Sequence, residues 1–272
     1  MSAAAKRPVL LEVVDGIARL TLNRPDASNA ISLELAEALA DATNELAVAD
    51  DVRAVLLRGA GPRFCAGGDV KAFAQSGDAL GEHLGAVLDA LHRAVSDLAE
   101  LDAPVVAAVQ GSAAGAGLSL VLGADLVVAG ASAQFVLAYT AIGLVPDGGS
   151  TWYLARLVGL RRATELALTN RVLDADEALA WGLVTRVVPD DAVEAEAEAL
   201  VAQLAAGPTG ALAGAKRLLR RSLQASLLEQ LGDEAIAMVR AGESSDGQEG
   251  VRAFVEKRSP EFGGNGGDPD EE

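Results

Sequence analysis

Cysteine, histidine and positive charge are all scarce in this chain of 272 residues. The single cysteine, Cys65, excludes a disulfide framework within the chain. The two histidines, His83 and His92, stand nine positions apart with no ligand spacing to the cysteine, so we expect no metal site and regard both as ordinary histidines. Lysine and arginine together number 22 against 39 acidic residues. This balance argues against a nucleic-acid-binding protein, which needs a cationic face.

A secretory leader and membrane spans are not visible either. The N-terminal residues lack an apolar segment of secretory length, so we expect a cytoplasmic protein. From Pro104 to Pro146 the only charge is Asp125, which leaves two uncharged runs of 21 residues, long enough to span a bilayer. Both runs are rich in glycine and alanine and are interrupted by serine and glutamine, a composition that does not favour insertion. We therefore expect strands buried on both faces of a sheet, with no membrane insertion.

Several common enzyme motifs are missing. The sequence has no Walker loop and no G-x-S-x-G turn. Gly115 and Gly117 do not have the spacing of a dinucleotide-binding fingerprint, so we expect no nicotinamide cofactor. Cys65 has no basic neighbour in the sequence, and this favours a packing role over a nucleophilic one.

The apolar pattern predicts an α/β body followed by helices alone. Asp15 and Gly16 separate two apolar runs and predict a β-hairpin, and Ser32 is placed to cap the next helix. Strands are expected at 9–14, 17–22, 54–57, 105–109, 126–128 and 135–137, and helices at 80–101, 114–122 and after Gly149. Beyond Gly207 only helical patterns remain, at 211–223, 227–241 and 247–257. We divide the chain into a core at 1–206, a helical extension at 207–262 and an acidic tail at 263–272 that we expect to be disordered.

Two glycine-dense turns stand between predicted strands and helices, at 65–69 and at 111–117. Glycine lets such a turn expose its backbone N–H groups, and the helix that follows adds its positive end. Two N–H groups from separate turns would form an oxyanion hole for a carbonyl that becomes an enolate. Tight packing of helix against strand is the alternative, and the sequence leaves both open.

Asp147 has an unusual place, directly after an apolar strand-and-loop run in the most apolar third of the chain. It either caps the helix that follows, or it is a partly desolvated carboxylate with a raised pKa, suited to moving a proton at carbon.

Taken together, five ordered segments resemble the crotonase (enoyl-CoA hydratase/isomerase) superfamily: residues 22–30, 64–69, 111–125, 163–182 and 253–260. The resemblance covers nearly the whole chain. It implies a spiral of ββα units, a C-terminal helical trimerisation region and acyl-CoA thioester substrates. It also implies a homotrimer or a dimer of trimers, and no cofactor beyond the coenzyme A that the substrate carries.

The resemblance assigns roles by position. Gly68 and Ala116 would supply the two backbone donors to the thioester oxygen. Arg24 would contact a phosphate, and Lys257 resembles the basic residue that reaches coenzyme A from its own or a neighbouring subunit. The other expected contacts to the adenine and pantetheine portions come from Asn23, Ala27, Ala66 and Gly67.

The departures from the family pattern concern the acids. Hydratases of this family place two glutamates over the substrate, and those positions fall here on Ser119 and Tyr139, which we expect in the substrate pocket. The segment around Asp147 resembles instead the ring-forming and Δ3,Δ2-enoyl-CoA isomerases of phenylacetate breakdown, in which an aspartate at this position is the catalytic acid/base. The resemblance thus favours an acyl-CoA isomerase. A hydratase that holds water with Asp147 alone and an acyl-CoA-binding module without chemistry are the alternatives.

Overall fold

The computed structural model describes residues 7–263, so the predicted acidic tail lies outside the described residues except for Gly263. Strands of this part form a six-stranded sheet, in the order β1-β2-β3-β4-β6-β9, and a three-stranded sheet, in the order β5-β7-β8. The strands are β1 (Val9–Val14), β2 (Ile17–Leu22), β3 (Ala54–Gly59), β4 (Val105–Val109), β5 (Ser112–Ala114), β6 (Leu126–Gly130), β7 (Gln134–Val136), β8 (Leu173–Asp174) and β9 (Arg186–Val188).

Helices make up most of the remainder. The α-helices are α1 (Leu33–Ala47), α2 (Val70–Gln75), α3 (Leu80–Glu100), α4 (Ala116–Gly123), α5 (Ser150–Val158), α6 (Leu160–Thr169), α7 (Ala175–Ala180), α8 (Val193–Ala205), α9 (Thr209–Ser222), α10 (Leu227–Glu243) and α11 (Ser245–Glu256). Short 3-10 turns occur at η1 (Pro25–Ala27), η2 (Gly77–Ala79), η3 (Thr140–Ile142) and η4 (Asp190–Ala192).

The predicted hairpin and helix cap are both confirmed. Strands β1 and β2 are antiparallel, with Val14 opposite Ile17 across the Asp15-Gly16 turn. The Ser32 side chain accepts a hydrogen bond from the Leu35 N–H at the beginning of α1. That bond satisfies one of the N–H groups that the first turn of a helix leaves unpaired.

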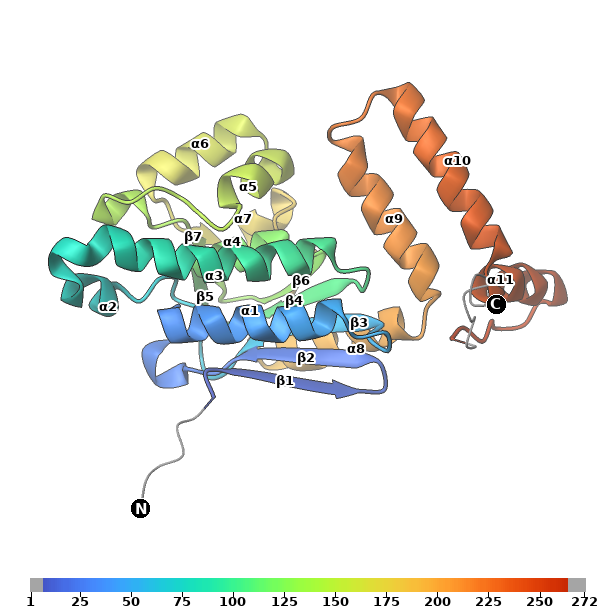
Figure 1. Cartoon of the computed structure of the whole chain (residues 1–272), viewed down its shortest axis with the longest axis horizontal. Helices are drawn as coiled ribbons and strands as arrows, with labels where there is room; N and C mark the ends of the chain where they lie inside the picture. The colour runs from blue at the N-terminus through green and yellow to red at the C-terminus, as the bar shows by residue number, and fades with distance from the viewer. Residues whose placement is uncertain (1–6, 264–272) are drawn as a thin grey trace, which may run out of the picture.

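The central strands β3, β4 and β6 of the six-stranded sheet are buried on both faces, as the uncharged runs predict for β4 and β6. Along β3, Val55 and Leu57 belong to the core that contains α1 and α3, whereas Ala54 and Leu56 belong to the core that contains α8. Figure 1 shows α1 and α3 side by side over one face of the sheet. Successive strand residues point to opposite faces, which is why a sheet covered on both sides reads as an unbroken apolar run.

One predicted helix begins later than expected. The sequence pattern places a helix at 114–122, but Ser112–Ala114 form β5, which pairs with β7, and α4 begins only at Ala116. Gly115 between them has a φ of 51° and a ψ of −127°, a conformation that interrupts any helix. A strand of three residues depends on a partner far along the chain, so local periodicity does not reveal it.

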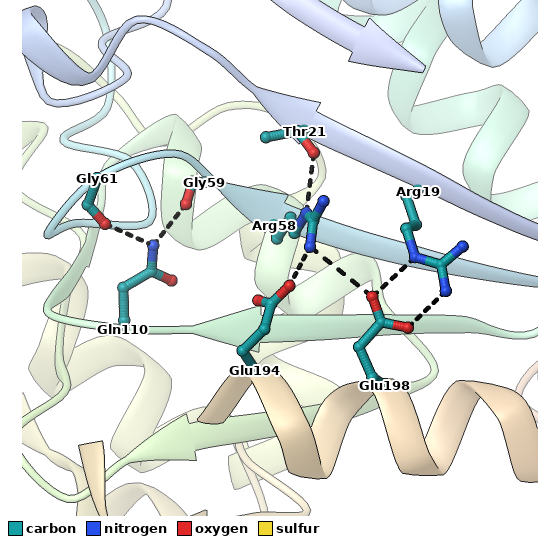
Figure 2. A network of polar contacts seen from close by, with 8 residues as sticks. All are labelled: Arg19, Thr21, Arg58, Gly59, Gly61, Gln110, Glu194 and Glu198. Carbon is teal, nitrogen blue, oxygen red and sulfur yellow. Dashed lines mark hydrogen bonds and ion pairs between the residues drawn. The ribbon is translucent and has the colours of Figure 1, made fainter. Parts of the chain in front are cut away.

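Ion pairs fix α8 to the sheet near its edge. Figure 2 shows Arg19 of β2 reaching Glu198 of α8 with two bonds, from Nε to Oε1 at 2.8 Å and from Nη2 to Oε2 at 2.7 Å. Arg58 of β3 pairs with Glu194 and also donates to the Thr21 hydroxyl. The Arg19 guanidinium holds the pKa of Glu198 below its usual value.

A second group of charges attaches α9 to the body of the protein. Asp125 accepts from Lys216 Nζ at 2.8 Å, from Arg220 Nη2 at 2.9 Å and from the Val105 N–H at 2.9 Å. The Lys216 side chain is only 8% exposed, and burial lowers its pKa. In Figure 1, α9–α11 extend to one side of the body that carries the sheets. Among residues 7–263, none of the helices combines the length and the hydropathy that crossing a bilayer requires.

Candidate active site

The two glycine turns of the sequence lie against each other. Cys65 and Ala113 form a parallel bridge, in which the Ala114 N–H donates to the Cys65 carbonyl at 2.9 Å. Gly67 has a φ of +91°, and a Cβ at this position would stand 2.8 Å from the Ala114 carbonyl oxygen. Glycine is therefore required there both for the backbone conformation and for the close approach of the second turn.

Both turns present an unused backbone donor. Within residues 7–263 neither the Gly68 nor the Ala116 N–H donates to another protein group. Gly68 immediately precedes Asp69, the N-cap of α2, and Ala116 is the first residue of α4. Helix N-termini carry partial positive charge, so both donors suit an oxygen that gains negative charge.

These donors open onto a cavity of about 250 Å³ with an apolar wall. The wall is formed by α2, α3, the first residues of α4 and the segment between β7 and α5. Its polar side chains are those of Tyr139 and Asp147; its apolar side chains belong to Ile31, Ala66, Val70, Phe73, Leu84, Val87, Leu88, Leu91, Ala116, Leu137, Ala138, Ile142, Leu144 and Val145. The cavity thus suits an uncharged acyl group and offers it one carboxylate.

The Asp147 side chain does not cap the helix that follows. The N-cap of α5 is Gly149, and no side chain caps this helix. Instead, Asp147 Oδ1 accepts a hydrogen bond from the Tyr139 hydroxyl at 2.6 Å. Burial raises the pKa of Asp147, and the Tyr139 hydrogen bond and the nearby His92 offset only part of that rise. Of the two interpretations that the sequence left open, the structure supports the desolvated carboxylate.

Ser119 and Tyr139 stand together beside Asp147. The Ser119 Oγ lies 3.2 Å from the Tyr139 hydroxyl oxygen and donates to the Asp147 carbonyl at 3.0 Å. Ser119 comes from α4 and Tyr139 from the segment just before η3, so three separate segments meet here. Both side chains are buried.

Sequence reasoning missed His92. The sequence predicts an ordinary histidine, but the His92 Nε2 accepts from the Gly148 N–H at 3.3 Å, beside Asp147. The two residues are 56 positions apart, and no local pattern links α3 to this turn. His83 lies elsewhere on α3, where its ring meets Phe73 edge to face. Among the described residues, no three histidine, cysteine, aspartate or glutamate side chains gather as a metal site requires.

Comparison with known proteins identifies the family of this chain. The sequence profile of the enoyl-CoA hydratase/isomerase family matches residues 12–265. The chain belongs to this family. It is 40% identical to the 1,2-epoxyphenylacetyl-CoA isomerase of Escherichia coli (strain K12) over 257 residues, which cover 94% of this chain and 98% of the relative. The crystal structure of an enoyl-CoA hydratase from Polaromonas sp. JS666 matches with a TM-score of 0.89 at 34% identity, over 94% of this chain and 99% of that one.

As a member of this family the protein is an enzyme, and an acyl-CoA thioester fits it as substrate. The crotonase fold class expected from the sequence is confirmed, with its α/β body and its C-terminal helices. The isomerase and hydratase names among its relatives leave the individual reaction to be argued from the site.

The loop expected to contact coenzyme A is held by its own asparagine. The buried Asn29 amide donates to the carbonyls of Ala60, Arg63 and Phe64, at 2.9–3.0 Å. The side chains of Asn23 and Arg24 also have protein partners: the Asn23 amide donates to the Arg7 carbonyl, and Arg24 pairs with Asp69 at 3.1 Å. This pair joins the loop to the turn that carries Gly68.

The remaining predicted contacts divide between two parts of the molecule. Ala27 ends η1 in the same loop, and the Ala66 N–H is already used, since it donates to the Ser28 carbonyl. Lys257 is the exposed C-cap of α11. Figure 1 places α11 at the opposite end of the molecule from α2, which lines the cavity. The roles of Asn23, Arg24, Ala27, Ala66, Gly67 and Lys257 toward coenzyme A stay predictions.

Cys65 packs between the two turns. Its thiol donates to the Asn29 carbonyl at 3.1 Å, and burial raises its pKa to about 12. A thiol with this pKa stays neutral at physiological pH, so it is a poor nucleophile.

Proposed function

We propose that this enzyme is an acyl-CoA isomerase that moves a double bond by proton transfer through Asp147. The observation that carries the proposal is the single carboxylate of a largely apolar cavity that two residues with unused backbone donors, Gly68 and Ala116, also line. Adding water to a double bond in the usual way of this family employs two glutamates, and their positions hold Ser119 and Tyr139. Isomerisation needs only one group that takes a proton and returns it.

The reaction has two steps. Asp147 removes a proton from the carbon next to the thioester of a 3-enoyl-CoA, and the electrons of that C–H bond move toward the thioester oxygen. The N–H groups of Gly68 and Ala116 stabilise the resulting enolate, and loss of one such donor costs roughly 3 kcal/mol of transition-state stabilisation. Asp147 then returns the proton to the γ carbon, and a 2-enoyl-CoA results. No proton or electron is gained or lost overall, so the proposal requires no separate cofactor.

The physical state of Asp147 supports this role. A general base works best when its pKa lies near the working pH, and burial moves the pKa of Asp147 in that direction. The relative named 1,2-epoxyphenylacetyl-CoA isomerase favours the isomerase class further. On the same ground, a ring-type isomerisation of the phenylacetate kind belongs to this proposal.

The decisive experiment compares the wild type with Asp147→Asn on a 3-enoyl-CoA. We expect the wild type to form the conjugated 2-enoyl-CoA and the variant to lose about 10²–10⁴-fold in kcat, the usual contribution of a general base. The matched control is Asp89→Asn, which changes an exposed acid on α3 and should keep full activity. Full activity in Asp147→Asn would contradict the proposal. Rapid loss of ultraviolet absorbance from a 2-enoyl-CoA would indicate a hydratase instead.

We also propose that the enzyme assembles as a homotrimer or a dimer of trimers. Large apolar side chains are exposed on α9–α11, including Leu227, Leu228 and Phe254, which are 75%, 82% and 86% exposed in the single chain. A surface of this kind in a soluble protein marks an interface. Light scattering should give three or six times the mass of the chain, and a stable monomer at micromolar concentration would contradict the proposal.

A further inference from the structure

The two carboxylate oxygens of Asp147 differ in their hydrogen bonding. Oδ1 is bound to the Tyr139 hydroxyl, whereas Oδ2 has no hydrogen-bond partner among residues 7–263. Resting on the function proposed above, we propose that Tyr139 is a positioning residue whose hydroxyl fixes Oδ2 of Asp147 as the oxygen that accepts and returns the substrate proton. In each turnover a C–H bond breaks and an O–H bond forms at Oδ2, and both changes are reversed at the γ carbon.

The hydrogen atoms near Asp147 can be assigned from the contacts. Ser119 and Tyr139 each own one hydroxyl hydrogen. The Ser119 hydrogen goes to the Asp147 carbonyl at 3.0 Å, which is nearer than the Gly115 carbonyl at 3.4 Å. The Tyr139 hydrogen then goes to Oδ1, whose 2.6 Å separation is typical of an O–H group that donates to a carboxylate. Ser119 thus holds the backbone of Asp147, and Tyr139 holds its side chain.

Packing fixes the positions of Asp147, Ser119 and Tyr139 relative to one another. The turn that carries Asp147 rests on Ser119, because a Cβ on Gly148 would lie 2.9 Å from the Ser119 Cβ. Gly148 has a φ of +57°, so this close approach also requires glycine. On the other side, the Tyr139 ring lies close to Gly115, at the beginning of α4. The hydroxyl of Tyr139 therefore has little freedom to leave Oδ1.

The charges around Asp147 suit a donor that never loses its proton. Burial and the Asp147 carboxylate both raise the pKa of Tyr139, so its phenol stays protonated throughout the working pH range. Asp147 is faced by Tyr139 from the η3 segment, by Ser119 from α4 and by His92 from α3. No lysine or arginine lines this cavity in the described part of the chain. Tyr139 therefore supplies the only hydrogen bond to the Asp147 carboxylate seen within residues 7–263.

A simpler role for Tyr139 is to fill the cavity wall with its ring. Tyr139→Phe separates the two roles, because it keeps the ring and removes the hydroxyl. The chain offers a matched control: its only other tyrosine, Tyr153, is half-buried on α5 and makes no hydrogen bond to Asp147. Tyr153→Phe removes one hydroxyl of the same kind from a neighbouring element.

The experiment measures the protonation of Asp147 in two ways, through the acid limb of the kcat/KM profile and through the titration of ¹³C-labelled aspartate carboxyls in the free protein. Asp147→Asn identifies the Asp147 resonance. His92→Gln shows how much of the pH dependence of kcat/KM comes from His92. We expect Tyr139→Phe to move both titrations upward by about one to two pH units, because a hydrogen bond to a charged group is lost. We expect Tyr153→Phe to coincide with the wild type. If both titrations of Tyr139→Phe coincide with those of the wild type, the inference is overturned.

A second probe covers the case in which Tyr139→Phe does not fold. In the Tyr153→Phe background Tyr139 is the only tyrosine, so 3-fluorotyrosine can be incorporated there alone. Fluorine makes the phenol a stronger donor, and we expect the Asp147 titration to move downward, opposite to the effect of phenylalanine. An unchanged titration would overturn the inference.

The two proposals fail in distinguishable ways. If Asp147→Asn retains isomerisation, the proposed function falls and the role of Tyr139 falls with it. If Asp147→Asn is inactive but Tyr139→Phe leaves the Asp147 titration unchanged, only the inference on Tyr139 is overturned and the proposed function stands.

Discussion

Asp125 lies in the middle of the apolar stretch 104–146 and Asp147 directly follows that stretch, yet the fold surrounds the two residues in opposite ways. Asp125 meets two cations, Lys216 and Arg220, together with a backbone N–H. Asp147 meets one neutral hydroxyl and lines a cavity. A carboxylate with its charge fully compensated holds structure together, whereas one left partly uncompensated keeps the capacity to take a proton.

The contrast explains why the two carboxylates differ in role. Asp125 precedes β6 and joins the body of the protein to α9, whose Lys216 is almost fully buried. Asp147 follows η3 and lines the same cavity as Gly68 and Ala116 of the glycine turns. The first carboxylate stabilises the attachment of the C-terminal helices, and the second is available for chemistry.

The largest effect on stability should come from Asp125→Asn. This change leaves Lys216 buried with no carboxylate, and breaking a buried ion pair in this way costs about 3–5 kcal/mol of unfolding free energy. We expect kcat of the folded variant to stay unchanged, since Asp125 is not part of the cavity wall. Urea denaturation at equal protein concentration measures the loss.

Asp102→Asn is the matched control for Asp125. Asp102 pairs with Arg217 of α9, the helix that also carries Lys216, but the side chains of Asp102 and Arg217 are 63% and 60% exposed. An exposed pair contributes about 1 kcal/mol at most. Equal losses in the two variants would show that burial does not distinguish Asp125 from an ordinary surface carboxylate.

The sequence reveals elements whose pattern is local. The hairpin at Asp15-Gly16 and the Ser32 cap follow from turn and cap chemistry within a few residues, and the structure confirms both. The strand β5 was missed because its partner, β7, begins some twenty residues later. Local periodicity carries no information about such a pairing.

The candidate site was predictable in part. The glycine turns and Asp147 were visible as unusual residues in their context, and the structure brings all three to one cavity. The partners of Asp147 were not visible as partners. Tyr139 reaches it only because the chain folds back through η3 and Gly143, which adopts the left-handed conformation. His92 arrives from a helix 56 residues away. Contacts of this kind depend on tertiary packing, which no spacing rule encodes.

A smaller effect of opposite sign is expected from Asp147→Asn, and it sharpens the comparison. The folded protein raises the pKa of Asp147, so this group favours folding fully below the pKa of an unfolded aspartate and loses that contribution as pH rises toward its folded pKa. The asparagine side chain does not ionise, so the variant does not lose stability in this way as pH rises. The difference in unfolding free energy, variant minus wild type, should therefore increase from acid to neutral pH and then level off. Urea denaturation at a series of pH values gives the difference directly. A difference that decreases over the same pH range would mean that the fold stabilises the Asp147 carboxylate. A base that is already stabilised in this way would have little drive to take a proton from carbon.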